Sequence, residues 1–350
     1  MVDLDNLSAS ELMKNLTDSG MEKETAMAMV ILVKIRIHLE KTIQETETDA
    51  DGDICWQPGT LSLEETQKLI LVQKDISYLE RIISEDPKKT NPFDLISLKE
   101  ARAQAANLLA YEKVPPGGDI IPFEDAKNLY REAASTARRH GWHFEATRIL
   151  ELMGKTSVTS ALAIVTTWPT EREQGITMPR DKPLKSALLE ALDVFKEALI
   201  PLANISPKNF YQFALRSDRV KTAAILFENV APETIATDKK YLPIIREIVE
   251  QDLRYITDNW AQLAKNNMDC YYWVYSIALI DLAKTLNAKH GTGINIPDCP
   301  LATSEAAEKA KKFSQYLDSR PHTTANTNEV VAAEKARKDR IIDACLAQPA

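Results

Sequence analysis

Residues 123–153 read FEDAKNLYREAASTARRHGWHFEATRILELM, and their pattern decides the fold class. Before Gly141, small and apolar residues recur every three to four positions, which is the spacing of one face of an α-helix. These residues are Ala126, Tyr130, Ala133 and Ala137. After Gly141, a second stripe continues through Ala146 and Leu150. The stretch therefore predicts two antiparallel helices joined by a turn at Gly141, with Gly154 ending the second helix.

Similar helical patterns occur along the rest of the chain. Near the start, Ser8 and Glu11 have the spacing of a capping box, and Gly20 marks a break between helices. A clean amphipathic stripe follows at Leu69, Val72, Ile76, Leu79 and Ile83. The chain as a whole predicts about ten to twelve helices and no significant sheet. Because it has only 10 glycines, an all-β fold or a nucleotide-binding α/β fold is disfavoured, and we expect an all-α fold.

The clearest break in the pattern is Val114–Asp119, which reads VPPGGD. Two prolines followed by two glycines cannot continue a helix, so we place the main boundary there. This predicts a two-lobed, multi-helix fold with helices tethered at both ends of the chain. The expected parts are an N-terminal helical arm and acidic linker at 1–60, a first helical lobe at 61–114, a main helical lobe at 115–320, and a C-terminal linker and helix at 321–350.

Charge is distributed unevenly along the chain, whose formal net charge is −8. Residues 1–120 carry 13 basic and 22 acidic side chains, a net charge of −9. Residues 127–221 carry 15 basic and 10 acidic side chains, a net charge of +5. An acidic first third and a mildly basic centre can bring copies of one chain together, or attract an anionic partner to the centre. The alternative is a mixed surface in which every charge is solvated.

The four cysteines lie far apart and form no C-x-x-C pair, which argues against a zinc ribbon or a thioredoxin-type site. No apolar run reaches the length of about 18 residues that spans a bilayer. The acidic N-terminus also lacks the basic start of a signal peptide. We therefore expect no membrane span and a cytoplasmic, intracellular and reducing location, although four cysteines would also permit two disulfides.

The sequence contains no complete motif for catalysis or metal binding. The acidic run Asp49–Asp53 resembles a calcium loop, but Pro58 stands where that loop requires a glutamate. His140 and His143 have only Glu145 nearby as a third ligand. No G-x-S-x-G, H-E-x-x-H or P-loop spacing occurs. We therefore predict no catalytic residue, no metal and no cofactor, and favour a non-catalytic protein.

Aromatic and basic side chains are interleaved in residues 209–221, which read NFYQFALRSDRVK. Aromatic rings can stack on bases while cations neutralise phosphates, so the basic centre at 127–221 is a candidate nucleic-acid-binding segment. The candidate residues are Arg131, Arg138, Arg139, Arg148, Lys208, Arg216, Arg219 and Lys221. The alternative is that the aromatic side chains are core and the charges solvated. The turn at Arg138–His143 is interpreted as a helix end, with an anion-contacting turn as the alternative.

Two further features indicate contacts between proteins. Aromatic residues are too dense at 271–275 to share one helix face, so that helix is either buried all round or presents an interface. A predicted helix at about 329–346 follows a polar linker, and such a tethered helix can dock on its own body or on another copy. The candidate interface residues are Tyr271, Tyr272, Tyr275, Val330, Ile341 and Ile342.

Taken together, these patterns favour a non-catalytic helical assembly protein that self-associates through its terminal helices and contacts other proteins. The main alternative is an RNA-coating protein, similar to a nucleocapsid protein, that binds single-stranded RNA with residues 127–221. A second alternative is an effector or enzyme whose site is assembled from distant residues and is not visible in the sequence.

Overall fold

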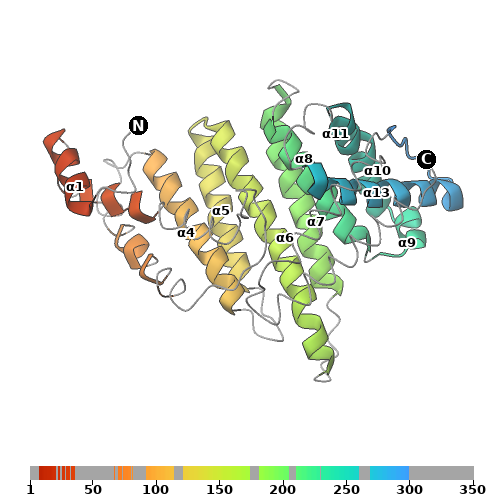
Figure 1. Cartoon of the computed structure of the whole chain (residues 1–350), viewed down its shortest axis with the longest axis horizontal. Helices are drawn as coiled ribbons and strands as arrows, with labels where there is room; N and C mark the ends of the chain where they lie inside the picture. The colour runs from red at the N-terminus through yellow and green to blue at the C-terminus, as the bar shows by residue number, and fades with distance from the viewer. Residues whose placement is uncertain are drawn as a thin grey trace. The chain divides into compact units, whose positions relative to one another are not determined.

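The computed structural model of the chain is all-α, with no strand among the residues that it describes (Figure 1). These are residues 8–20, 92–113, 121–173, 181–204, 210–228, 230–259 and 269–298, together with separate helical positions within 23–35 and 67–81. The predicted all-α class is therefore confirmed. The predicted C-terminal linker and helix at 321–350 lie outside the described residues.

The chain divides into two compact units, which we describe separately. The first unit comprises Met1–Val114 and Asp119–Ile149, and the second comprises Pro115–Gly118 and Leu150–Ala350. The division falls inside helix α6 (His143–Glu173), whereas the sequence places its main boundary at the break beginning at Val114. The lobe ranges expected from the sequence stay a prediction.

The first unit begins with α1 (Ala9–Asp18). The hydroxyl of Ser8 accepts a hydrogen bond from the Glu11 amide, and the Glu11 carboxylate accepts one from the Ser8 amide. This reciprocal pair confirms the predicted capping box. The predicted break at Gly20 is also confirmed, because its φ of +89° lies in the left-handed region that favours glycine.

Three further helices of the first unit are α4 (Pro92–Lys113), α5 (Ile121–Arg139) and the beginning of α6. Helices α4 and α5 pack side by side (Figure 1). One core cluster of this unit joins α4 to the helical positions around 35 and 72–79. It consists of Ile35, Val72, Ile76, Leu79, Leu98, Ala101, Ala105 and Leu109.

The second unit is centred on α8 (Phe210–Glu228), which packs against α7 (Asp181–Leu199) and is crossed by α13 (Asp269–His290) (Figure 1). A 3₁₀ turn, η1 (Ile200–Asn204), follows α7. Helix α9 (Pro232–Thr237) leads to a continuous helical stretch with three parts. These are α10 (Tyr241–Glu247), the π-helical segment η2 (Ile248–Leu253) and α11 (Arg254–Asp258).

The structure corrects the predicted role of Gly154, which does not end a helix. Helix α6 continues through it to Glu173. A Cβ built on Gly154 would lie only 2.5 Å from the ring of Phe195 in α7. Glycine is therefore used here because the two helices approach closely, and not because the backbone requires a left-handed residue.

Candidate functional site

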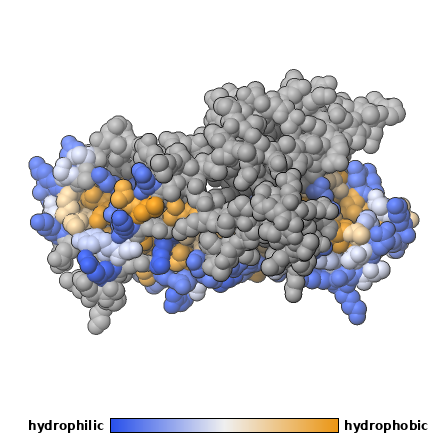
Figure 2. Space-filling view, turned by 90° about the horizontal axis from the view of Figure 1, so that it is seen from below, coloured by the Kyte–Doolittle hydropathy of each residue, from blue (hydrophilic) through white to orange (hydrophobic). Residues whose placement is uncertain are grey.

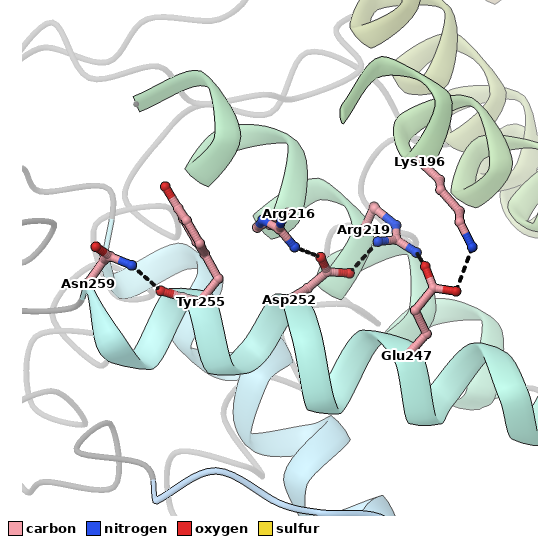
Figure 3. A network of polar contacts seen from close by, with 7 residues as sticks. All are labelled: Lys196, Arg216, Arg219, Glu247, Asp252, Tyr255 and Asn259. Atoms are coloured by element: carbon pink, nitrogen blue, oxygen red, sulfur yellow. Dashed lines mark hydrogen bonds and ion pairs between the residues drawn. The ribbon is translucent and has the colours of Figure 1, made fainter. Parts of the chain in front are cut away.

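The main polar cluster of the second unit lies between α8 and the stretch formed by α10, η2 and α11. Arg216 and Arg219 are one turn apart on α8 and point toward Asp252 in η2 (Figure 3). Arg216 Nη1 is 2.6 Å from Asp252 Oδ1, and Arg219 Nη1 is 2.6 Å from Asp252 Oδ2. One buried carboxylate therefore holds two guanidinium groups.

The cluster continues to the edge of the unit through Glu247 of α10. Arg219 Nη2 donates to Glu247 Oε1 at 2.8 Å, and Lys196 Nζ of α7 donates to Glu247 Oε2 at 2.6 Å (Figure 3). Lys196, Arg216, Arg219, Glu247 and Asp252 thus join three parts of the second unit. We call these five residues the ion-pair network.

The π-helical segment explains how Glu247 and Asp252 reach the same partner. In a regular α-helix, residues five apart point in directions that differ by about 140°. A π-helix closes its hydrogen bonds between residues five apart, so it brings such residues onto one face. Segment η2 begins after Glu247 and contains Asp252, and both carboxylates bind Arg219. The local widening of the helix therefore builds the network.

Burial differs along the network and sets the pKa of each carboxyl group. Asp252 is fully buried, and this burial raises its pKa, while the charges of Arg219 and Arg216 oppose the rise. Partial burial also acts to raise the pKa of Glu247, but hydrogen bonds from Lys196 and Arg219 outweigh it and leave the pKa lowered. The network therefore has a buried end at Asp252 and an exposed end at Lys196.

Tyr255 of α11 extends the contacts of the network on the side of Arg216. The guanidinium carbon of Arg216 lies 4.7 Å from the centre of the Tyr255 ring, which is a cation–π contact (Figure 3). Partial burial raises the pKa of the Tyr255 hydroxyl. Arg216 therefore has both a charged and an aromatic partner within the second unit.

A second buried acid, Asp218, faces the opposite way on α8. Lys155 of α6 lies beside it, with 3.9 Å between Nζ and Oδ2, but Lys155 is held more closely by Glu151 at 2.8 Å. Burial raises the pKa of Asp218 to about 6, while the charge of Lys155 acts to lower it. Among the described residues, the buried Oδ2 atom of Asp218 has no hydrogen-bond partner. Asp218 is thus a poorly compensated buried acid.

The predicted nucleic-acid-binding residues do not form one surface. Arg216, Arg219 and Lys221 lie on α8, where the two arginines belong to the ion-pair network and Lys221 Nζ lies 5.7 Å from the centre of the Tyr275 ring. These contacts favour a role in packing. Lys208 lies outside the described residues.

The other four candidates belong to the first unit. Arg148 donates to both carboxylate oxygens of Glu100 in α4 and also to Glu145, so it fastens α6 to α4. Burial acts to lower the pKa of Arg148, but the hydrogen bonds that it donates to the two glutamates outweigh this effect and raise the pKa. Arg131, Arg138 and Arg139 lie on α5, with Arg138 and Arg139 in its last turn, and Arg131 and Arg139 are exposed.

The predicted interface residues are only partly described. Tyr275 is fully buried within the second unit, so its ring contributes to the packing of α13. Tyr271 and Tyr272 lie in the first turn of α13, but their side chains are outside the described set. Val330, Ile341 and Ile342 lie outside the described residues. Their proposed role in contacts between proteins stays a prediction.

The turn between α5 and α6 is confirmed in detail. Gly141 has a φ of +75°, its amide donates to the carbonyl of Arg138, and the amide of Trp142 donates to the carbonyl of Ala137. These two bonds define a Schellman motif, which commonly ends a helix. The motif leaves His140, His143 and Phe144 exposed to solvent. The RRHGWHF run at 138–144 is the sequence signal for this exposed basic and aromatic turn, but only its two arginines were among the predicted site residues.

The described residues contain no group of three or more His, Cys, Asp or Glu side chains that could hold a metal ion. Within the same part of the chain, no helix is both long and apolar enough to cross a membrane. No known family, curated protein or solved structure matches the chain. Its function therefore has to be argued from its own residues.

Proposed function

We propose that this protein is a non-catalytic helical assembly protein that associates with further copies of itself. The charged side chains of the ion-pair network and of Arg148 support this proposal, because they hold helices of one unit together.

One surface carries the proposal. Ile70 and Leu71 are 44% and 57% exposed, although the other aliphatic residues described in the same segment, Val72, Ile76 and Leu79, are buried. Figure 2 shows hydrophobic residues gathered on one face of the part of the molecule that contains α1 and α4. Large apolar side chains that remain exposed beside a core commonly mark a contact with another protein.

The uneven charge of the chain favours another copy as that partner. Residues 1–120 have a net charge of −9 and residues 127–221 a net charge of +5. The first segment of one copy and the centre of another therefore attract each other. Such a contact combines apolar burial near Ile70 and Leu71 with electrostatic steering, and its strength decreases as salt is added.

The experiment compares the oligomeric state of the wild type with that of the double variant I70K/L71K by light scattering after size exclusion. We expect the wild type to be larger than a 39 kDa monomer and the variant to be monomeric. The matched control is Ile200→Lys, which introduces a lysine at an exposed apolar residue of the second unit. A wild type that remains monomeric at millimolar concentration, or a control that dissociates as readily as the variant, contradicts the proposal.

A second candidate function is the coating of single-stranded RNA. One observation favours it, namely the exposed cations Arg131 and Arg139 on α5. RNA coating predicts that the purified protein carries nucleic acid. A ratio of absorbance at 260 to that at 280 nm that is high in low salt and falls after a high-salt wash supports this function. A low ratio, together with no binding of added RNA, excludes it.

A further inference from the structure

Three charged side chains meet between α6 and α8 in the second unit. Glu151 and Lys155 are one turn apart on α6, and Lys155 Nζ donates to Glu151 Oε1 at 2.8 Å. The same Nζ atom is 3.9 Å from Oδ2 of Asp218 on α8. One lysine therefore stands between two carboxylates, of which only one accepts a hydrogen bond from it. We call Glu151, Lys155 and Asp218 the acid–lysine triad.

The two acids of the triad are buried, but the lysine is not. Glu151 is 8% and Asp218 9% exposed, whereas the side chain of Lys155 is 46% exposed. Oδ2 of Asp218 is buried and has no hydrogen-bond partner among the described residues. Burial without a partner destabilises a charged carboxylate far more than a protonated carboxyl group. The geometry therefore favours a proton on Asp218 as long as Lys155 is bonded to Glu151.

The other helices packed against α8 do not supply the missing partner of Asp218. Lys221 follows on α8 itself, and its Nζ lies 5.7 Å from the centre of the Tyr275 ring of α13. The arginines of the ion-pair network bind carboxylates on the other side of α8. Within the described residues, no charged side chain of α7 or α13 contacts Asp218. The protonation of Asp218 is therefore governed mainly by burial and by the two triad residues of α6.

The electrostatic balance within the triad agrees with this geometry. Burial raises the pKa of Asp218 from 3.8 to about 6, the charges of Lys155 and Lys221 oppose the rise, and the charge of Glu151 adds to it. The carboxyl group of Asp218 therefore changes its charge within the pH range in which proteins are folded.

We propose that the acid–lysine triad is a pH-sensitive latch between α6 and α8. In the closed latch Asp218 carries a proton and Lys155 is bonded to Glu151, so no unpaired negative charge is buried at this contact. When Asp218 releases its proton to water, a second buried negative charge appears beside Glu151. Lys155 then moves toward Asp218, because its half-exposed side chain is free to shift and its Nζ atom already lies between both acids.

One lysine cannot fully neutralise two buried carboxylates. In the deprotonated triad the two acids repel each other across the contact, and each gains hydration when the helices separate. The packing of α6 on α8 is therefore weakened as pH rises through the titration of Asp218. This device belongs to the second unit alone, so it does not depend on whether the protein self-associates.

The first measurement follows the side-chain carboxyl carbon of Asp218 by NMR in the full-length protein, labelled with ¹³C at aspartate. Its resonance is the one that Asp218→Asn removes. We expect a titration midpoint near pH 6. Lys155→Gln should raise this midpoint by about one pH unit and Glu151→Gln should lower it by about one, because each removes a nearby charge. Lys155→Arg keeps the positive charge and should preserve the wild-type midpoint.

The matched control is Lys284→Gln on α13. Lys284 Nζ is 3.8 Å from Asp281 Oδ1, nearly the same separation as in the triad, but both side chains are 65% exposed. Removing this lysine should leave the midpoint of Asp218 unchanged. Thermal unfolding of each variant at low pH, where the latch is closed, establishes that the fold is intact.

The second measurement is hydrogen exchange of the α6 amides at residues 152–160, corrected for the intrinsic dependence of exchange on pH. In the wild type we expect protection to be about tenfold lower at about pH 7.5 than at about pH 5. Asp218→Asn should remove this difference, because asparagine cannot ionise.

Each alternative result contradicts the latch. A midpoint near the ordinary aspartate value of about 4 would show that the charge of Asp218 is compensated in the folded protein. A raised midpoint that neither Lys155→Gln nor Glu151→Gln changes would show that burial acts without the triad. A midpoint that responds as expected, with unchanged protection of α6 between the two pH values, would show that the triad titrates without loosening the contact.

Discussion

Arg219 and Asp252 face each other across α8 and the π-helical segment η2, with 2.6 Å between Nη1 and Oδ2, and both side chains are almost completely buried. A charge removed from water in this way requires a close and complete set of partners. Arg216 supplies the second guanidinium group for Asp252, and Glu247 supplies a second carboxylate for Arg219. The position of η2 against α8 therefore depends on a balance of charges as well as on apolar packing.

This balance predicts that substitutions at the two ends of the ion-pair network lower the unfolding free energy by different amounts. Asp252→Asn removes the charged partner of the half-buried Arg216 and one of the two carboxylates that hold the buried Arg219, so we expect the second unit to lose about 3–5 kcal/mol of unfolding free energy. Lys196→Gln removes an exposed partner of Glu247 and should cost less than about 1 kcal/mol. Hydrogen exchange of the amides in α8 and η2 measures both effects within this unit. Equal costs for the two variants would show that burial does not govern the network.

A double-mutant cycle separates the pair from its surroundings. Asp252 and Arg216 are each replaced singly and together, by Asn and Met, and the coupling energy is obtained from the four unfolding free energies. We expect a coupling of about 1–3 kcal/mol, because the two side chains are in direct contact. Tyr255→Leu, which removes only the cation–π partner of Arg216, provides a reference and should cost about 1–2 kcal/mol.

Local sequence patterns predicted the helices because each depends on neighbouring residues. The capping box at Ser8 and Glu11, the break at Gly20 and the left-handed turn at Gly141 are all decided within a few positions. The π-helical segment leaves no such signal, since the apolar spacing across 241–258 is compatible with one regular helix. The prediction that Gly154 ends a helix is wrong for a similar reason. Glycine is required there by the ring of Phe195, which belongs to another helix and leaves no signal in the neighbouring sequence.

Local sequence patterns predict the candidate site even less well than they predict the helices. The count of basic residues at 127–221 treats Arg216 and Arg219 as available cations, but their partner Asp252 lies more than thirty residues further along the chain. Pairing over that distance depends on how α8 packs, which residue spacing does not reveal. In the sequence, the exposed Arg131 and Arg139 of α5 cannot be told from the buried Arg219 of α8, and only the packing of the helices distinguishes them.

The raised pKa of Asp218 leads us to expect that part of the protein's stability decreases as pH rises. Its pKa is raised from 3.8 to about 6 in the folded protein, so between these values the folded state binds more protons than the unfolded state. Stability contributed by this group is therefore present at low pH and is lost as pH rises through 6. For a shift of about two pKa units the loss amounts to about 3 kcal/mol.

The matching experiment uses Asp218→Asn, which cannot ionise. We expect the variant to be more stable than the wild type at pH 8, by about 3 kcal/mol, and this advantage to vanish near pH 4. Urea unfolding at several pH values, followed by tryptophan fluorescence, gives the difference. A variant that is less stable than the wild type at pH 8 means that the charge of Asp218 is well compensated, and the assignment fails.

Because α6 and α7 approach closely, we expect even the substitution of Gly154 by alanine to destabilise the protein. An alanine ordinarily stabilises a helix interior by about 1 kcal/mol relative to glycine. Here its Cβ would lie 2.5 Å from the buried ring of Phe195, and such overpacking costs about 1–3 kcal/mol. We therefore expect Gly154→Ala to lower the thermal midpoint. The double variant G154A/F195L should recover part of the loss, whereas additive effects of the two changes would exclude the steric explanation.

A substitution at Arg148 tests whether this arginine of the basic centre contributes to packing or to nucleic-acid binding. It donates to both oxygens of Glu100, at 2.7 Å for Nη1 and Oε1, and a lysine cannot reproduce this bidentate geometry. Arg148→Lys keeps the positive charge, so a phosphate contact would be largely preserved, while the fastening of α6 to α4 would be lost. We expect a loss of about 1–3 kcal/mol in the first unit, seen as faster hydrogen exchange in α4, and unchanged affinity of the folded protein for oligouridine. If exchange is unchanged and RNA affinity falls, Arg148 belongs to the binding surface after all.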